Sequence, residues 1–234
     1  MRIMPLGDSA LRIELGDTID ERTLGRVRAA DEALTSAPLP GVVEVVPAYT
    51  TLTVYYDLPA LIAAGAPADD AVVWLTGQLA QRLKKAGKSS VRGARVVEIP
   101  VCYGGEFGPD LGRIAGVAKL SVEEVVRRHA KPEYLVALIG FAPGFPYLLG
   151  LPKELATPRI IRPRMQVAAG TVGIAGEQTG IYPLATPGGW NLLGRTPLRL
   201  FRPENTPPTL LQAGDRVKFR PITAEQFRQL EAGA

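Results

Sequence analysis

The sequence has few of the residues that build disulfides and metal sites. Its 234 residues include a single cysteine, Cys102, and a single histidine, His129. One cysteine can form neither an intramolecular disulfide nor a thiolate metal site, and this usage fits a reducing compartment. The N-terminal residues show no apolar run followed by a small-residue cleavage site. We therefore expect a cytoplasmic protein without a bound metal.

Long apolar runs and the standard catalytic motifs are also missing. No stretch approaches the ~20 apolar residues that a membrane-spanning helix needs. There is no G-x-S-x-G, H-E-x-x-H or G-x-G-x-x-G motif in a suitable context. The run Gly87–Ser89 imitates the end of a phosphate-binding loop, but Arg82 stands where the first glycine is required. These absences argue against a self-contained hydrolase or dehydrogenase.

Positive charge is unevenly distributed along the chain. The formal net charge is +4, and the stretch from Thr157 to Arg202 carries six arginines against one acidic residue, Glu177. These arginines are Arg159, Arg162, Arg164, Arg195, Arg199 and Arg202. Each alone is explained as a solvated surface residue, but a cluster within a glycine-rich stretch favours a small anionic ligand.

The first part of the chain alternates strand and helix signals. Strands are expected where apolar and polar side chains alternate, and helices where apolar residues recur at helical spacing. The expected strands are Ala10–Leu15, Val42–Val46, Thr50–Tyr56 and Arg95–Val101, and the expected helices start at Asp17 or Thr18 and after Pro67. This βαββαβ order predicts an α+β, ferredoxin-like N-terminal domain.

A polar stretch, Lys84–Gly93, indicates the junction between two domains, 1–92 and 93–234. From Phe141 onward, short apolar segments alternate with glycine- and proline-rich turns, which predicts an all-β, closed barrel. Three further elements are expected: a helix opened by the capping box of Ser121 and Glu124 and ending at His129, a strand at Glu133–Gly140, and a helix at Thr223–Leu230.

Two other chemistries are possible on residue types alone. Cys102 and His129 could form a nucleophile–base pair, yet free cysteines are among the most buried residues. The helices expected at Leu111–Ala118 and Ser121–His129, with the basic pI of about 9.3, resemble a helix-turn-helix. The valines of the second helix indicate burial instead of groove contact. We prefer neither interpretation.

The most informative region runs from Gly140 to Pro197. Its glycines and prolines fix unusual backbone angles and let main-chain N–H groups approach a ligand. Arginine offers a planar fork for carboxylate or phosphate, and Gln178 can both donate to and accept from an amide. Flat apolar surface comes from Phe141, Tyr147, Tyr182 and Trp190. Together these residues predict a small-molecule pocket; the alternative is barrel corners with aromatic packing.

Several runs in this region carry a family resemblance. They are Gly140-Phe-Ala-Pro-Gly-Phe-Pro-Tyr-Leu148, Ala169-Gly-Thr-Val-Gly-Ile-Ala-Gly176 and Thr186-Pro-Gly-Gly-Trp-Asn-Leu-Leu-Gly-Arg195. They closely resemble the KipI-like, or allophanate hydrolase subunit 1, family, and looser matches extend the resemblance over nearly the whole chain. The resemblance implies a small N-terminal α/β domain followed by a cyclophilin-like β-barrel.

The resemblance also implies a function. The leading expectation is the opening of 5-oxo-L-proline to L-glutamate with ATP hydrolysis, by a complex in which this chain is inactive alone. Its expected partners are two other polypeptides, one KipA-like and one lactam-opening, and ATP with Mg²⁺ is bound jointly with a partner. The alternatives within the family are inhibition of a sensor histidine kinase by direct binding and a carboxyltransferase or allophanate hydrolase module of urea metabolism.

Under this resemblance, roles are assigned to the candidate residues. Arg164 and Arg195 are expected to hold a carboxylate or phosphoryl group, Gln178 to contact the lactam, and the Gly170–Gly176 backbone to donate to an oxyanion. His129 either moves a proton or caps a helix end, where the charged imidazole is favoured. The catalytic set is thus His129, Arg164 and Gln178; the substrate-binding set is Arg195, Tyr182, Trp190, Phe141, Gly173 and Gly176.

Overall fold

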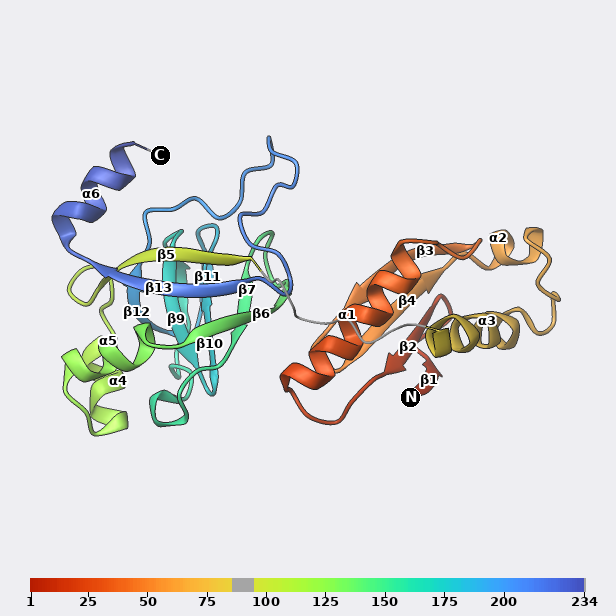
Figure 1. Ribbon diagram of the computed structural model, residues 1–234, viewed down its shortest axis with the longest axis horizontal. Helices are drawn as coiled ribbons and strands as arrows, with labels where there is room; N and C mark the ends of the chain where they lie inside the picture. Colours follow the sequence, from red (N-terminus) through yellow and green to blue (C-terminus); the bar gives the residue numbers. More distant parts are fainter. Residues whose placement is uncertain (86–94, 234) are drawn as a thin grey trace. The chain divides into compact units, whose positions relative to one another are not determined.

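The computed structural model describes residues 1–85 and 95–233 (Figure 1). They belong to two compact units, Met1–Arg92 and Gly93–Ala234. Most of the predicted junction at Lys84–Gly93, and all of Gly87–Ser89, lie outside the described residues. Within the described ranges, no helix has both the length and the apolar character needed to cross a membrane.

The N-terminal unit is a four-stranded antiparallel sheet with helices. Its elements are β1 (Arg2–Pro5), β2 (Ala10–Glu14), α1 (Glu21–Thr35), β3 (Val42–Pro47), β4 (Thr51–Tyr56), α2 (Leu58–Ala63) and α3 (Ala71–Lys85). The strand order is β1-β2-β4-β3. Alternate residues of β2 and β4, such as Ile13 and Val54, are fully buried and pack with Val27 of α1 and Leu75 of α3.

The expected ferredoxin-like arrangement is not confirmed. The strand predicted at Arg95–Val101 is β5 (Val96–Tyr103), and it belongs to the barrel of the second unit. The fourth strand of the N-terminal sheet is instead β1, paired with β2. The helix α1 is capped by Asp20, whose carboxylate accepts from the Thr23 amide at 2.7 Å, and not by Asp17 or Thr18.

The expected closed β-barrel is confirmed in the second unit. Its strands follow the order β10-β7-β6-β13-β5-β12-β9. Their bounds are β5 (Val96–Tyr103), β6 (Glu133–Ile139), β7 (Pro146–Leu149), β9 (Thr171–Ala175), β10 (Gln178–Ile181), β12 (Asn191–Arg195) and β13 (Arg216–Ile222). Neighbours are antiparallel except β5 and β13, which run parallel. The interior is filled by a continuous apolar cluster that includes Ile99, Val136 and Val217.

The remaining elements surround the barrel. They are α4 (Leu111–Ala118), α5 (Val122–Ala130), the 3₁₀ turn η1 (Lys153–Leu155), the ribbon of β8 (Arg164–Val167) and β11 (Thr186–Gly188), and α6 (Ala224–Ala232). The helices α4 and α5 lie side by side (Figure 1). They bury Ile114 and Val125 in the barrel core. This burial disfavours the helix-turn-helix interpretation, because the second helix is part of the core.

Candidate functional site

An aromatic pocket lies on the barrel unit. It is a cavity of about 110 Å³. Its lining residues are Phe141, Phe145, Tyr147, Arg159, Tyr182, Pro187, Gly188, Gly189 and Trp190. Three residues predicted from the sequence to bind substrate, Phe141, Tyr182 and Trp190, therefore meet in one cavity. We call this cavity the aromatic pocket.

Phe145 is the centre of the pocket's packing. Its ring is buried and lies 4.8 Å from Tyr147, 5.3 Å from Tyr182 and 5.4 Å from Trp190, measured between centroids, in tilted or edge-to-face contacts. Edge-to-face pairs of this kind stabilise beyond their buried area by about 0.5–1.5 kcal/mol. The aromatic wall is therefore a fixed surface.

Glycines on two barrel strands make room for these rings. A Cβ atom at Gly180 would lie 3.0 Å from two atoms of the Phe145 ring. A Cβ atom at Gly173 would lie 3.2 Å from Cβ of Trp190. We expected Gly173 to contact the substrate. Its role in the structure is instead steric, because the absence of a side chain at Gly173 leaves space for Trp190.

Phe141 stands at the mouth of the pocket with a rare backbone conformation. Its φ is +69°, its side chain is 66% exposed, and its ring contacts Phe145 edge to face at 5.5 Å. The turn is closed by the Phe145 amide, which donates to the Ala142 carbonyl at 3.0 Å. A bulky residue at positive φ is an outlier, and such strain collects at functional sites.

Arg159 supplies positive charge at the pocket. Burial raises the pKa of the Tyr147 and Tyr182 phenols, while the positive charge of Arg159 acts in the opposite direction on both. Both phenols are therefore neutral donors near pH 7. Arg159 forms no ion pair with any residue that the structure describes. The pocket thus combines a cation, two hydroxyls and flat apolar walls.

Arg164 lies behind this pocket. Its Nη2 donates to Oδ1 of Asp110 at 2.8 Å, and the other carboxylate oxygen of Asp110 accepts from the Leu192 amide at 2.7 Å. On the ribbon, Arg164 pairs with Gly188, which lines the pocket. Nη1 of Arg164 is buried and has no hydrogen-bond partner among the described residues. Arg164 therefore positions the pocket wall and keeps one buried donor unused.

Arg195 and Gln178, like Arg164, do not line the aromatic pocket. Arg195 donates from Nε to the Ala169 carbonyl at 2.9 Å and lies 5.6 Å above the Phe227 ring. It lines a separate cavity of about 160 Å³. Gln178 begins β10, next to the turn after β9. The expected cleft shared by these three side chains is therefore not supported.

The expected oxyanion donors are already engaged at both ends of their segment. The Gly170 amide donates to the Tyr182 carbonyl at 2.7 Å. The Gly176 amide donates to the Thr157 carbonyl at 2.8 Å, and Gly176 occupies the β9–β10 turn at φ +57°. Gly176 thus forms a turn and does not line the aromatic pocket.

His129 lies inside the barrel, with no exposed surface. Its Nδ1 lies 2.8 Å from the Tyr103 hydroxyl and its Nε2 3.1 Å from the Thr179 hydroxyl, and its ring stacks on Phe219 at 4.7 Å. Burial lowers the pKa of His129 to about 3. The prediction that His129 caps the helix end in its charged form is therefore wrong. Burial destabilises the charged imidazole more than the end of the helix stabilises it. Both ring nitrogens are taken by hydroxyls, so the Cys102 pair does not form.

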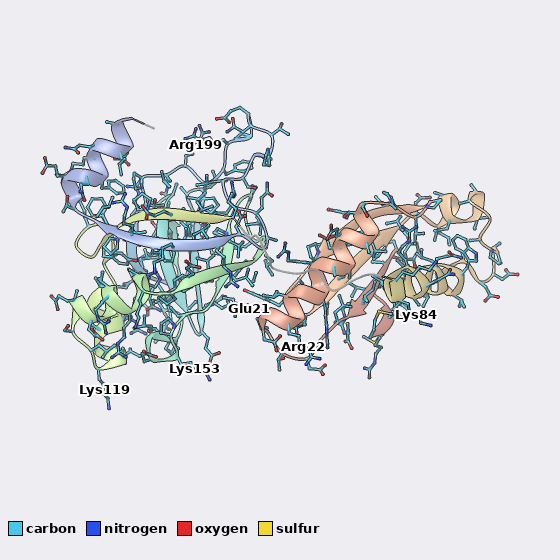
Figure 2. All side chains as sticks on the ribbon, viewed as in Figure 1. Glu21, Arg22, Lys84, Lys119, Lys153 and Arg199 are labelled. Atoms are coloured by element: carbon cyan, nitrogen blue, oxygen red, sulfur yellow. The ribbon has the colours of Figure 1, made fainter. Side chains whose placement is uncertain are left out.

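The six arginines between 157 and 202 do not form one cluster. Arg199, on the loop between β12 and β13, pairs with Glu204 at 3.1 Å (Figure 2). Arg195 lies 3.5 Å from Glu231, and Arg164 is held by Asp110. Only Arg159 of this set reaches the aromatic pocket. The sequence alone does not distinguish Arg159 from Arg162 and Arg164, because the residues that flank these three arginines are similar.

The described residues do not offer a metal site of their own. Across residues 1–85 and 95–233, no group of three or more His, Cys, Asp or Glu side chains could hold a metal ion. Mg²⁺ that is bound together with a nucleotide needs only one or two protein carboxylates beside the phosphates, so the expected joint Mg²⁺ site stays a prediction.

Comparisons with known proteins cover nearly the whole chain. The chain is 48% identical to the B subunit of 5-oxoprolinase from Bacillus subtilis (strain 168) over 233 residues, 97% of this chain and 95% of the relative. A conserved uncharacterized protein of Pyrococcus horikoshii is 43% identical, with a TM-score of 0.57, over 97% of this chain and all of that one.

A second similar structure belongs to a longer chain. The solved protein TTHA0988 is 39% identical, with a TM-score of 0.77, over 92% of this chain, and this chain spans 40% of that chain's length. A family model described as carboxyltransferase domain, subdomain C and D, matches residues 1–211. The chain therefore belongs to this carboxyltransferase-domain family.

Proposed function

We propose that the chain is the B subunit of an ATP-dependent 5-oxoprolinase, which opens 5-oxo-L-proline to L-glutamate with ATP hydrolysis. Its proposed partners are a KipA-like polypeptide and a lactam-opening polypeptide. The observation that carries the proposal is the aromatic pocket with Arg159 in a chain 48% identical to a protein of that name. We propose no activity for the chain alone.

The chemistry of 5-oxoproline matches this pocket. The molecule is a five-membered ring with a planar amide and one carboxylate. Pockets for drug-sized ligands measure about 300–1,000 Å³, so a cavity of about 110 Å³ suits a much smaller compound. Flat aromatic walls bury the ring, and a guanidinium pairs with a carboxylate through charge-assisted hydrogen bonds. A small cyclic acid is thus the ligand class that the pocket fits best.

We assign roles to the pocket residues on this basis. Arg159 binds the substrate carboxylate, and the neutral Tyr147 and Tyr182 phenols donate to the lactam carbonyl. Phe141 covers the ring at the mouth and limits the access of water. When bound, ATP would transfer its terminal phosphoryl group to the lactam oxygen and leave as ADP. Water would then add to the activated carbon, and phosphate would leave as the C–N bond opens. This chain's contribution is to bind and orient the lactam.

The other residues predicted from the sequence take different places in the proposal. Arg164 is a positioning residue, because it fixes the ribbon that forms the pocket wall. Gln178 begins β10 and does not line the aromatic pocket, so its expected lactam contact stays a prediction that only substitution can test. His129 and Arg195 have no proposed contact with substrate, since one is buried inside the barrel and the other lines a different cavity.

Reconstitution tests the proposal. This chain and its two purified partners are mixed with 5-oxoproline, ATP and Mg²⁺, and ADP and glutamate are measured, with each polypeptide omitted in turn. We expect both products only when this chain is present. Arg159→Ala and Gln178→Ala are compared with Arg12→Ala, which removes a partly exposed arginine of β2 in the N-terminal unit that does not line the pocket. If no combination forms glutamate, while the chain inhibits a histidine kinase or supports urea carboxylation, the proposal is wrong.

A further inference from the structure

Three arginines, Arg95, Arg199 and Arg202, line another cavity of the barrel unit, which measures about 670 Å³. Apart from Arg95, its lining residues all belong to the segment 198–210 of the connection between β12 and β13, on which Figure 2 labels Arg199. We call this segment the arginine loop. Two arginines of the basic stretch, Arg199 and Arg202, therefore meet at a cavity that is separate from the aromatic pocket.

The arginine loop is held in shape by hydrogen bonds. The Arg202 amide donates to the Pro208 carbonyl at 2.7 Å, which closes the loop across itself. Arg95, just before β5, donates from Nη2 to the Leu210 carbonyl at 2.6 Å and to Oδ2 of Asp215 at 2.6 Å. The loop is thus tied to the barrel, and the cavity is formed before any ligand binds.

The three arginines differ in how far their charge is already balanced. Arg95 is held by Asp215, whereas Arg199 pairs with Glu204 at 3.1 Å in a contact where both side chains are more than half exposed. Such exposed ion pairs are weak, so Arg199 can exchange its partner for a stronger anion. Arg202 is half-buried and forms no ion pair with any residue that the structure describes. The cavity therefore has positive charge available to a ligand.

The donors around this charge match phosphate groups. Arginine presents a planar fork that pairs with phosphate oxygens through two parallel hydrogen bonds. Asn205, Thr206 and Thr209 line the same cavity and add an amide and two hydroxyls as neutral donors. Several donors on one side of a cavity favour a ligand with several phosphate oxygens over a single carboxylate.

The size of the cavity also favours a nucleotide. Small-molecule sites measure about 300–1,000 Å³, and about 670 Å³ lies within this range. The aromatic pocket, at about 110 Å³, is too small for a nucleotide. Among the described residues that line the larger cavity, none has an aromatic ring that could stack on a base. The phosphates are therefore the part of a nucleotide that this chain is equipped to bind.

The arginine loop also touches the turn at the mouth of the aromatic pocket. Gly144 lies in this turn, between Phe141 and Phe145, with a φ of +83°. A Cβ atom at Gly144 would lie 3.2 Å from Cβ of Phe201 and 3.6 Å from the Leu200 carbonyl oxygen. A ligand held by the arginine loop is therefore adjacent to the turn that carries Phe141.

We propose that the arginine loop binds the triphosphate of the ATP consumed in the proposed reaction, with Arg199 and Arg202 on the phosphate oxygens. The inference rests on the proposed function. Arg95 is a positioning residue, because its contacts hold the loop. Glu204 lines the same cavity and offers the type of ligand that Mg²⁺ uses beside phosphates. Contacts to the base are left to a partner polypeptide.

Direct binding of inorganic tripolyphosphate to the full chain tests the proposal. Calorimetry at fixed ionic strength compares the wild type with the loop variant, Arg199→Gln with Arg202→Gln. The control is Arg127→Gln with Arg220→Gln, which removes two exposed arginines elsewhere on the barrel unit and changes the net charge equally. We expect saturable binding that the loop variant weakens by roughly 30-fold or more and the control by less than about 2-fold, since only the loop variant loses charge-assisted hydrogen bonds.

Two further arms define the ligand and the role of the fork. MgATP is expected to displace tripolyphosphate from the wild type. Arg202→Lys keeps the charge but loses the planar fork, and it should weaken binding less than Arg202→Gln does. In the reconstituted complex, the loop variant should raise KM for ATP more than KM for 5-oxoproline.

Several outcomes overturn the arginine loop as the triphosphate site. These are no saturable binding by the wild type, an equal loss in the control variant, no displacement by MgATP, or displacement by hexaglutamate at equal concentration, which would assign the cavity to an acidic peptide. Glutamate formation with an unchanged KM for ATP in the loop variant would also overturn it and leave the proposed function intact. Tripolyphosphate binding at the loop in a chain whose complex forms no glutamate would contradict the proposed function and leave the phosphate site standing.

Discussion

Nη2 of Arg164 and Oδ1 of Asp110 lie 2.8 Å apart and join the ribbon behind the aromatic pocket to the start of α4. The two residues are 54 positions apart in the sequence. Asp110 also accepts the Leu192 amide, so one carboxylate holds both β8 and β12. The shape of the pocket wall therefore depends on a side chain outside the pocket.

Removing this carboxylate is expected to destabilise the barrel unit. Asp110→Ala leaves a partly buried guanidinium and a backbone amide without their acceptor, which costs about 1.5–3 kcal/mol for hydrogen bonds to a charged group. Chemical denaturation measures the loss. Glu106→Ala serves as the control, because Glu106 is mostly exposed and pairs only with exposed Arg228. Equal stability of the two variants would contradict the structural role of Asp110.

Arg159→Ala is expected to lower kcat/KM of the reconstituted complex for 5-oxoproline by about 10- to 150-fold, which corresponds to one charge-assisted hydrogen bond. The loss should fall mainly on KM, because the carboxylate does not change charge during the reaction. Steady-state glutamate formation measures both constants. An unchanged KM would remove Arg159 from the substrate site.

Phe141 links backbone strain to the pocket. Its φ of +69° is costly for any residue with a Cβ atom, so Phe141→Gly should be more stable than Phe141→Ala by about 1 kcal/mol. Both variants lose the ring at the pocket mouth, and both should have lower kcat/KM than the wild type. Thermal melting and product formation are measured on the same pair. A glycine variant less stable than the alanine variant would contradict the strain.

His129 is expected to make stability depend on pH. Its pKa is about 3 in the folded barrel and about 6.5 when unfolded, so the unfolded chain binds more protons between these values. The stabilisation is present above about pH 6.5 and is lost as the pH falls toward 3. Between pH 8 and pH 5 the free energy of unfolding should fall by about 2 kcal/mol.

The pH effect is isolated by substitution. His129 is the only histidine, and the carboxylates with lowered pKa titrate below this window. Burial raises the pKa of Asp31, but this group is present in both proteins, so its effect cancels when their slopes are compared. His129→Phe should be less stable at every pH, because the Tyr103 and Thr179 hydroxyls lose their partner, but its stability should be nearly flat from pH 8 to pH 5. The same slope in both proteins would show that His129 is not buried in its neutral form.

Local signals predicted much of the fold. Alternation identified β2 and β4, and the capping box at Ser121 located the start of α5, because these features depend on neighbouring residues. The partner of β5 was not predictable in this way. It pairs with β13, about 120 residues away, and no pattern within β5 indicates which sheet it joins.

The site was predicted only in part for a similar reason. Phe141, Tyr182 and Trp190 combine aromatic rings with adjacent glycine and proline, which is a local signal for a pocket wall. Arg195 resembles a ligand-binding arginine in sequence, but its contacts are with Phe227 and Glu231 of the C-terminal helix. An arginine is available to a ligand only if residues distant in the sequence do not already bind its side chain.

The most direct test of the central claim is substrate binding at Trp190. The chain contains two tryptophans, Trp74 in the N-terminal unit and Trp190 in the aromatic pocket. Fluorotryptophan is incorporated into this chain alone, Trp74→Phe assigns the two resonances, and 5-oxoproline is titrated into the complex with unlabelled partners. We predict a saturable ¹⁹F shift of Trp190 but not of Trp74, which is lost in Arg159→Ala. No shift, or equal shifts of both tryptophans, would contradict the aromatic pocket as the lactam site.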